Sequence, residues 1–176
     1  MLFRSVIITG GADTDDILLS TSAGDIEVDT VSATPAGDVI LTSAAAIIDT
    51  DGNSALTADD FSFTAATSIG SVANRINTTV SEILLGNSTG TGDIYLNESN
   101  AITLTNVINA GGLIDILAGG QITAVSVTTT GGADSDDIVL ETTAGDIEIG
   151  TVSATPGGDV GLTSAAAITD TDGDSM

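Results

Sequence analysis

A 46-residue stretch occurs twice in the chain, and this internal repeat constrains the fold more than any other feature of the sequence. Residues 9–54 and 130–175 align without a gap, each residue of the first copy matching the one 121 positions later, and ten of the 46 pairs differ. A long internal repeat is typical of proteins built as arrays of similar units. We therefore expect an array in which residues 55–129 form a unique section between the two copies.

The differences between the copies separate inside from outside. Alternate apolar positions stay apolar in both copies, whereas the positions beside them change freely, and such a period of two with one tolerant face predicts strands that lie with one side on a core. The inward positions are Ile17, Leu19, Ile26, Val28, Val39 and Leu41, matched by Ile138, Leu140, Ile147, Ile149, Val160 and Leu162. The variable, outward positions are Leu18, Ser20, Ile40 and Ile48, matched by Val139, Glu141, Gly161 and Thr169.

Short apolar strand candidates recur about every ten residues between polar, Gly-rich turns, and no stretch carries a sustained helical period. Two all-β architectures fit this pattern, a parallel β-helix and tandem β-sandwiches. The chain is 41% hydrophobic but 2% aromatic, so aliphatic side chains must fill the core, and this favours the β-helix. At about 20 residues per coil we expect roughly eight coils. The candidates are residues 16–20, 24–28, 30–34, 37–41, 44–48, 54–58, 61–65, 68–80, 81–85, 92–96, 101–108, 113–117 and 121–129.

The charge of the chain narrows the classes of partner. The formal net charge is −23, with 25 acidic residues against two Arg and no Lys. Such a surface repels nucleic acid and anionic membranes and attracts cations or cationic partners. There is no Cys, which excludes disulfides and thiol chemistry, and no apolar run is long enough to insert in a membrane.

The ends of the sequence match the repeat poorly. Matching fails across residues 2–4, so we expect residues 1–4 to be foreign or disordered. The second copy stops within a polar turn near residue 175. We expect residues 1–176 to be a single segment of a longer array, with any export signal outside it.

Three stretches resemble the repetitive bacterial surface proteins related to filamentous haemagglutinin and to autotransporter adhesin passengers. They are GDIYLNE at 92–98, SIGSVANRINTTV at 68–80 and LTSAAAIIDTDGNS at 41–54. The resemblance covers residues 16–176 and implies a right-handed parallel β-helix stalk on the surface of a Gram-negative-type bacterium. It also implies adhesion to host or matrix glycans or surface proteins, contact with neighbouring repeats of the same chain, and no catalytic residues or cofactor.

Calcium binding is the alternative function that the acidic turns suggest. Asp49, Asp51, Asn53 and Asp60 have the spacing of oxygen ligands at positions 1, 3, 5 and 12 of an EF-type loop. Ser54 stands where that loop needs Gly, and the flanks predict strands rather than helices. A plain polar turn is the competing interpretation.

Two further acidic units follow Gly pairs. Gly10, Gly11, Asp13 and Asp15, with their counterparts at 131–136, resemble one nonapeptide of a calcium-binding β-roll. That roll binds calcium between consecutive nonapeptides, and here each unit stands alone, which favours a simple Gly-rich turn.

A polysaccharide-acting enzyme is the third hypothesis, because pairs of carboxylates can hydrolyse glycosidic bonds. The chain has no His to act as a general base, and Arg75 is the one cation outside the foreign N-terminus that could neutralise an anionic substrate. We therefore predict a non-catalytic stalk.

Overall fold

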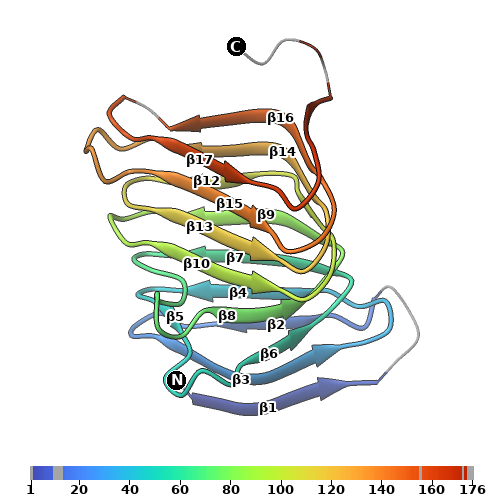
Figure 1. Cartoon of the computed structure of the whole chain (residues 1–176). Helices are drawn as coiled ribbons and strands as arrows, with labels where there is room; N and C mark the ends of the chain where they lie inside the picture. Colours follow the sequence, from blue (N-terminus) through green and yellow to red (C-terminus); the bar gives the residue numbers. More distant parts are fainter. Residues whose placement is uncertain (1, 10–13, 155, 172, 174–176) are drawn as a thin grey trace.

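The computed structural model describes residues 2–9, 14–154, 156–171 and 173, and all regular secondary structure in these residues is β-strand. The chain winds back and forth between two sheets that face each other across a shared core, with the N-terminus at one end of the stack and the C-terminus at the other (Figure 1). Every pairing between strands is parallel, which excludes tandem antiparallel sandwiches. The fold is a β-solenoid of about seven turns, close to the roughly eight coils expected.

We call the two sheets sheet 1 and sheet 2. Sheet 1 contains β1 (Leu2–Ile8), β3 (Ile26–Ala33), β5 (Ile47–Ile48), β6 (Ala55–Thr57), β8 (Ile76–Thr79), β10 (Ile94–Glu98), β13 (Ile114–Ala118), β15 (Ile138–Thr142) and β17 (Val160–Thr163). Sheet 2 contains β2 (Ile17–Ser20), β4 (Val39–Ser43), β7 (Asp60–Ala65), β9 (Glu82–Ser88), β11 (Ile102–Leu104), β12 (Val107–Asn109), β14 (Ile122–Thr129), β16 (Ile147–Ala154) and β18 (Ile168–Asp170).

Residues 2–4 belong to β1, which pairs with β3 from Leu2 opposite Glu27 to Ile8 opposite Ala33. The strand that contains them is therefore the first layer of sheet 1. Whether residues 1–4 are foreign to the protein stays a prediction.

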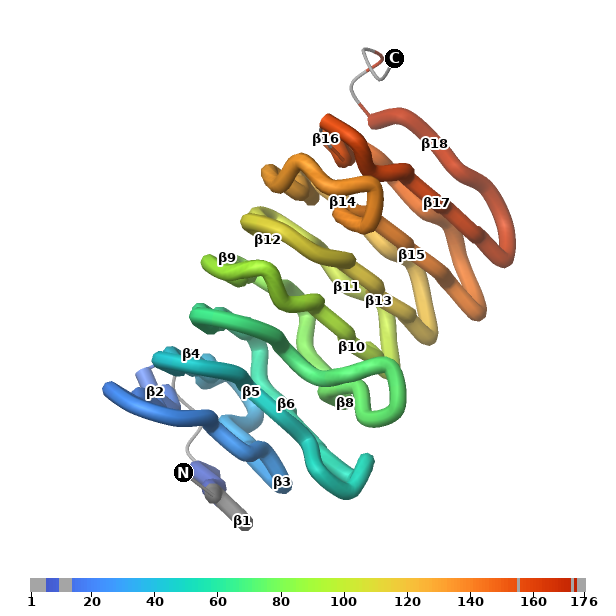
Figure 2. The backbone as a smooth tube through the Cα atoms, turned by 90° about the vertical axis from the view of Figure 1, so that its left-hand side faces the viewer, coloured from blue at the N-terminus to red at the C-terminus, as the bar shows by residue number. Residues whose placement is uncertain are grey.

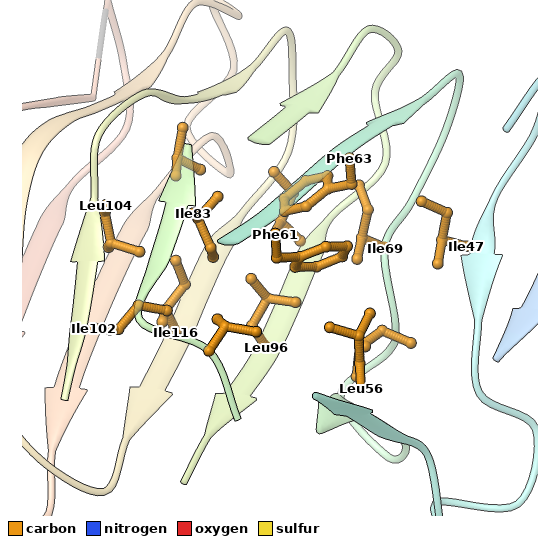
Figure 3. Close-up of a cluster of buried hydrophobic side chains, with 14 of the residues drawn as sticks. Ile47, Leu56, Phe61, Phe63, Ile69, Ile83, Leu96, Ile102, Leu104 and Ile116 are labelled. Carbon is orange, nitrogen blue, oxygen red and sulfur yellow. The ribbon is translucent and has the colours of Figure 1, made fainter. Parts of the chain in front are cut away.

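Columns of aliphatic side chains run through the core parallel to the stacking direction. In sheet 1 six isoleucines occupy one register position in successive layers, and all are fully buried. They are Ile26, Ile47, Ile69, Ile94, Ile114 and Ile138. Figure 3 shows how side chains from the two sheets meet between them. Stacking of like side chains at one strand spacing of about 4.8 Å lets each layer fill the same narrow space.

One layer of sheet 2 contributes two aromatic rings to the core. Phe61 and Phe63 are buried, and their ring centroids lie 5.2 Å apart (Figure 3). Gly86 lies opposite Phe63 in the next strand, where a Cβ atom would stand 2.7 Å from the phenylalanine Cζ atom. The absence of a side chain at Gly86 therefore makes room for the ring.

Equivalent strands of the two copies lie in opposite sheets. Ile17 begins β2 in sheet 2, whereas its counterpart Ile138 begins β15 in sheet 1. Paired positions in successive coils are 20 to 25 residues apart, as Ile94 with Ile114 and Ile122 with Ile147 show. The pairing of Ile17 with Val39 gives 22 residues, so half a coil is about 11 residues. An offset of 121 residues is then eleven half-coils, an odd number, and it carries the second copy to the other side (Figure 2).

Inside and outside agree with the pattern of differences between the copies. Ile17, Ile26, Val39 and Leu41 are buried, while the variable Leu18 and Ile40 are exposed. Leu19 is half-buried, and Val160, in the last layer of sheet 1, is 43% exposed. The inward assignment is thus confirmed for most positions of the two copies, while Ile149 in β16 and Leu162 in β17 are half-buried, like Leu19.

The alternation slips within several of the longer strands. Residues 24–28 and 30–34, predicted as separate strands, merge into β3, where Asp29 and Thr30 both stay outside between the buried Val28 and Val31. Conversely, residues 101–108 divide into β11 and β12 around Thr105 and Asn106. Two successive outward residues bend the strand while keeping both flanking apolar residues in the core.

The aliphatic columns predict that Ile→Ala lowers the free energy of unfolding far more inside the core than on the outer face. We expect Ile94→Ala to lower the free energy of unfolding by about 2–5 kcal/mol, because it opens a cavity between Ile69 and Ile114. The matched change Ile40→Ala, on the outer face, should cost less than about 1 kcal/mol. Urea unfolding followed by circular dichroism measures both, and equal losses would contradict the assignment of the core.

Candidate functional site

Six aspartates at one repeated position each link a coil to the next one. Each precedes the first inward residue of a strand, and its Oδ1 atom accepts the backbone N–H at the same position one coil later. The pairs, with the accepting carboxylate first, are Asp16 and Asp38 (3.0 Å), Asp25 and Ala46 (2.9 Å), Asp38 and Asp60 (3.3 Å), Asp93 and Leu113 (2.9 Å), Asp137 and Asp159 (2.7 Å), and Asp146 and Ala167 (2.9 Å). These acidic side chains therefore hold the backbone at the start of the strand in the next coil.

Asp49, the first candidate calcium ligand, is only 5% exposed and directs its carboxylate into its own turn. Oδ1 accepts the backbone N–H groups of Asp51 (3.1 Å) and Gly52 (2.7 Å), and Oδ2 accepts that of Ser54 (2.8 Å). Burial by itself raises the pKa of Asp49, but the hydrogen bonds from Ser54, Gly52 and Asp51 outweigh it, and the pKa is lowered from its usual 3.8. Both oxygens of the Asp49 carboxylate are therefore engaged by backbone N–H groups of its own turn.

The other three candidate ligands are placed differently from Asp49. Asp51 is exposed and accepts the side-chain N–H of Asn53 at 3.0 Å. Asp60 opens β7 in sheet 2, where its backbone N–H donates to Asp38. Within the described part of the chain no three His, Cys, Asp or Glu side chains group in a way that could hold a metal ion. Calcium binding stays a prediction.

The Gly-rich units are described in the second copy alone, because Gly10, Gly11 and Asp13 lie outside the described residues. In the second copy Asp136 is buried, and its carboxylate accepts the backbone N–H groups of Gly112 (2.6 Å) and Ala133 (2.8 Å). This carboxylate thus joins its own turn to the previous coil. Nothing in the sequence pattern predicted that Asp136 would be buried.

Arg75 ties three layers of sheet 1 together on their outer side. Its Nη2 atom lies 2.6 Å from Oδ2 of Asp115, and Nη1 donates to the carbonyl oxygens of Leu96 (3.2 Å) and Asp115 (3.0 Å). The guanidinium carbon is 5.5 Å from the centroid of the Tyr95 ring. The cation that a bound anionic substrate would need is therefore engaged in the fold.

Tyr95 points outward between the buried Ile94 and Leu96 and is half-buried against Arg75. Burial raises the pKa of the Tyr95 phenol, the nearby carboxylates of Asp93 and Asp115 raise it further, and Arg75 opposes them. The neutral phenol donates a long hydrogen bond of 3.4 Å to Asp93.

Glu98 is a buried carboxylate that sequence reasoning missed. Its side chain is 1% exposed, and Oε2 accepts the Thr78 hydroxyl (2.8 Å) and the Val80 N–H (3.0 Å), while Oε1 accepts the Asn100 N–H (2.9 Å). Its position inside the turn follows the inward alternation of β10, in which Ile94 and Leu96 are also buried. The inward alternation of β10 could have predicted the burial of Glu98, had it been applied to a charged residue.

Two shallow hollows adjoin each other along the edge where sheet 1 turns into sheet 2. Their volumes are about 320 and 290 Å³, and hydroxyl, amide and small apolar side chains line them. The lining residues are Thr57, Ala58, Thr79, Val80, Ser81, Asn100, Ala101, Ile102, Thr103, Gln121 and Thr123. No ionisable side chain is among them, so the hollows offer hydrogen bonds but no acid or base.

Comparison with protein-family models, with curated proteins and with solved structures finds no match to this chain. None of the described residues belongs to a helix long and apolar enough to span a membrane.

The turn around Asp49 yields a pH-dependent prediction. We expect Asp49→Asn to lower the free energy of unfolding at pH 7 by about 1–3 kcal/mol, because the Ser54 N–H loses its carboxylate acceptor. The pKa of Asp49 is lower in the folded protein than in the unfolded chain, so its contribution is complete above pH 3.8 and is lost as the pH falls through the folded value. The stabilities of the two proteins should therefore converge in acid.

Urea unfolding from pH 7 to 3 in the presence of a chelator measures this difference. Asp51→Asn is the control, since Asp51 is exposed and accepts no backbone N–H. An equal effect of both substitutions, or an effect of Asp49→Asn that needs calcium, would show that the carboxylate acts otherwise than through its turn.

Proposed function

We propose that the chain is a passive, length-adding stalk segment of a large secreted or surface-exposed protein that serves adhesion. Its contribution is mechanical: a stiff rod that holds a contact surface away from its point of attachment. It acts without catalysis and without a cofactor.

The observation that carries this proposal is the continuity of the stack. The isoleucine column of sheet 1 passes unbroken from β3 to β15, and parallel hydrogen-bond ladders run the same way on both sides of it (Figure 1). A solenoid of this kind grows by nearest-neighbour contacts alone, so length is gained by adding coils without redesigning the core. Such growth suits a spacer.

The use of the polar side chains supports a structural role. The repeated aspartates, Asp49, Glu98 and Asp136 all accept backbone N–H groups, and Arg75 is held by Asp115 and two carbonyl groups. Among the described residues no buried side-chain nitrogen or oxygen lacks a hydrogen-bond partner. These carboxylates and Arg75 hold turns and coils together.

The resemblance to filamentous-haemagglutinin-like and autotransporter proteins supports the adhesive context. Stalks of that type stand outside the cell and contact host or matrix glycans or surface proteins. The acidic, Ser- and Thr-rich surface of this chain suits a hydrated extracellular rod, since its net charge is −23.

Duplication of the repeat unit tests the proposal. A second copy of residues 14–134, inserted after Asp134, adds 121 residues in register with the repeat. Because a coil is about 22 residues long, this insertion should lengthen the particle by about 26 Å at unchanged cross-section. Small-angle X-ray scattering measures both dimensions.

An insertion that thickens the particle, or that leaves the added residues unfolded, would argue against a stalk. Thermal melts of the parent chain with millimolar calcium and with chelator provide the second arm. A fold that forms only with calcium would replace the stalk by a calcium-controlled module, and release of reducing ends from polysaccharides would replace it by an enzyme.

A further inference from the structure

The outer face of sheet 2 over its first four layers is ordered into columns of different chemistry. The strands β2, β4, β7 and β9 lie side by side in this order (Figure 1). Outward side chains at the same position of successive strands form the columns, because the strands pair in parallel. An apolar column stands between an acidic one and one of hydroxyl and amide groups.

The apolar column is formed by Leu18, Ile40, Leu84 and Leu85, with Ser62 in the layer of β7. Leu18 pairs with Ile40, Ile40 with Ser62, and Ser62 with Leu85. The exposed fractions of the four apolar residues are 70%, 37%, 49% and 39%. These residues are outside the core, so the fold does not account for their hydrophobicity. Large apolar side chains gathered on an outer face are characteristic of interaction sites.

The acidic column runs parallel to the apolar column at the start of the same strands. It consists of Asp16, Asp38, Asp60 and Glu82, one carboxylate in each layer. They precede Leu18, Ile40, Ser62 and Leu84 by two residues, and Leu85, which pairs with Ser62 across a β-bulge, is three residues after Glu82. Asp16 is exposed and the other three are half-buried. One strand spacing of about 4.8 Å separates the layers, so four negative charges follow one line. On the other flank of the apolar column stand Ser20, Thr42, Thr64 and Asn87.

We propose that this face binds a cationic amphipathic helix of a partner protein, laid along the stacking direction. The apolar side of the helix would cover the apolar column, and Lys or Arg side chains on one flank would reach the acidic column. The turns of an α-helix are spaced by about 5.4 Å, close to the spacing of about 4.8 Å between layers. About three helical turns would therefore meet one anchor in nearly every layer.

The negative charge of this face favours a cationic helix over other apolar partners. A second copy of this chain carries the same net charge of −23 and the same acidic column, so face-to-face packing would bring like charges together. Anionic lipid is repelled for the same reason. A helix with basic residues beside its apolar side satisfies both columns at once.

A labelled peptide of Leu and Lys, roughly 14 residues long and with its Leu residues on one helical face, is a direct probe. We expect saturable binding to the full chain, measured by fluorescence anisotropy, and at least about tenfold weaker binding of a scrambled peptide of the same composition. The double variant Leu18→Ser, Leu84→Ser should weaken binding of the ordered peptide by about tenfold.

The acidic column is tested separately with Asp16→Asn and Glu82→Gln, which keep the side-chain shape and an oxygen acceptor. We expect weaker binding and a smaller dependence on salt, since two charges are removed. The matched controls change an exposed apolar residue and exposed acids elsewhere: Val72→Ser, and Asp134→Asn with Glu141→Gln. These controls should bind the peptide as the parent does.

Three results would overturn the proposal. Equal binding of the ordered and scrambled peptides, or equal losses in the control variants, would indicate unspecific attraction to an acidic protein. Self-association abolished by Leu18→Ser, Leu84→Ser would assign the face to a second copy of the chain. Absence of saturable binding would show that the apolar column does not serve this partner class. None of these results bears on lengthening by the inserted unit, so the stalk is tested independently.

Discussion

The structure depends on the stacking of equivalent residues at one strand spacing along a parallel ladder. Because each coil lies directly above the last, a residue type that fits one layer must fit beside itself in the next, and the column from Ile26 to Ile138 follows from this rule. The same rule explains a core with few aromatic rings. Where Phe61 and Phe63 enter, the adjoining strand has to provide Gly86.

Stacking also places like charges in successive layers, and the protein uses these carboxylates as hydrogen-bond acceptors between coils. Carboxylates in successive layers would repel one another if they pointed into a shared line with nothing between them. At the strand starts each aspartate instead reaches forward to an N–H of the following coil, as Asp25 does to Ala46 and Asp146 does to Ala167. Asp25 and Asp146 are counterparts in the two copies, so the device is part of the repeat. An acidic composition is thereby compatible with a tightly stacked rod.

The sequence predicted the parallel strands and the inward and outward positions, because a period of two and the drift between copies report directly on burial. It did not predict that equivalent strands of the two copies lie in opposite sheets. That outcome depends on the length of a coil, and the sequence pattern does not distinguish a coil of 22 residues from the expected 20. It also missed the role of Asp49: ligand spacing was visible in the letters, but the direction of the carboxylate is set by the N–H groups of Asp51, Gly52 and Ser54.

Equivalent strands of the two copies lie in opposite sheets, and this affects their inward and outward residues differently. Inward residues are buried in either sheet, as Ile17 in sheet 2 and Ile138 in sheet 1 show. Outward residues face different surroundings in the opposite sheet, and the exposed pair Leu18 and Ile40 of sheet 2 corresponds to Val139 and Gly161 of sheet 1. The apolar column is therefore absent from the second copy. Selection for the core alone would leave that column unexplained, and this is the physical reason to look for a partner on one face and not on its repeat.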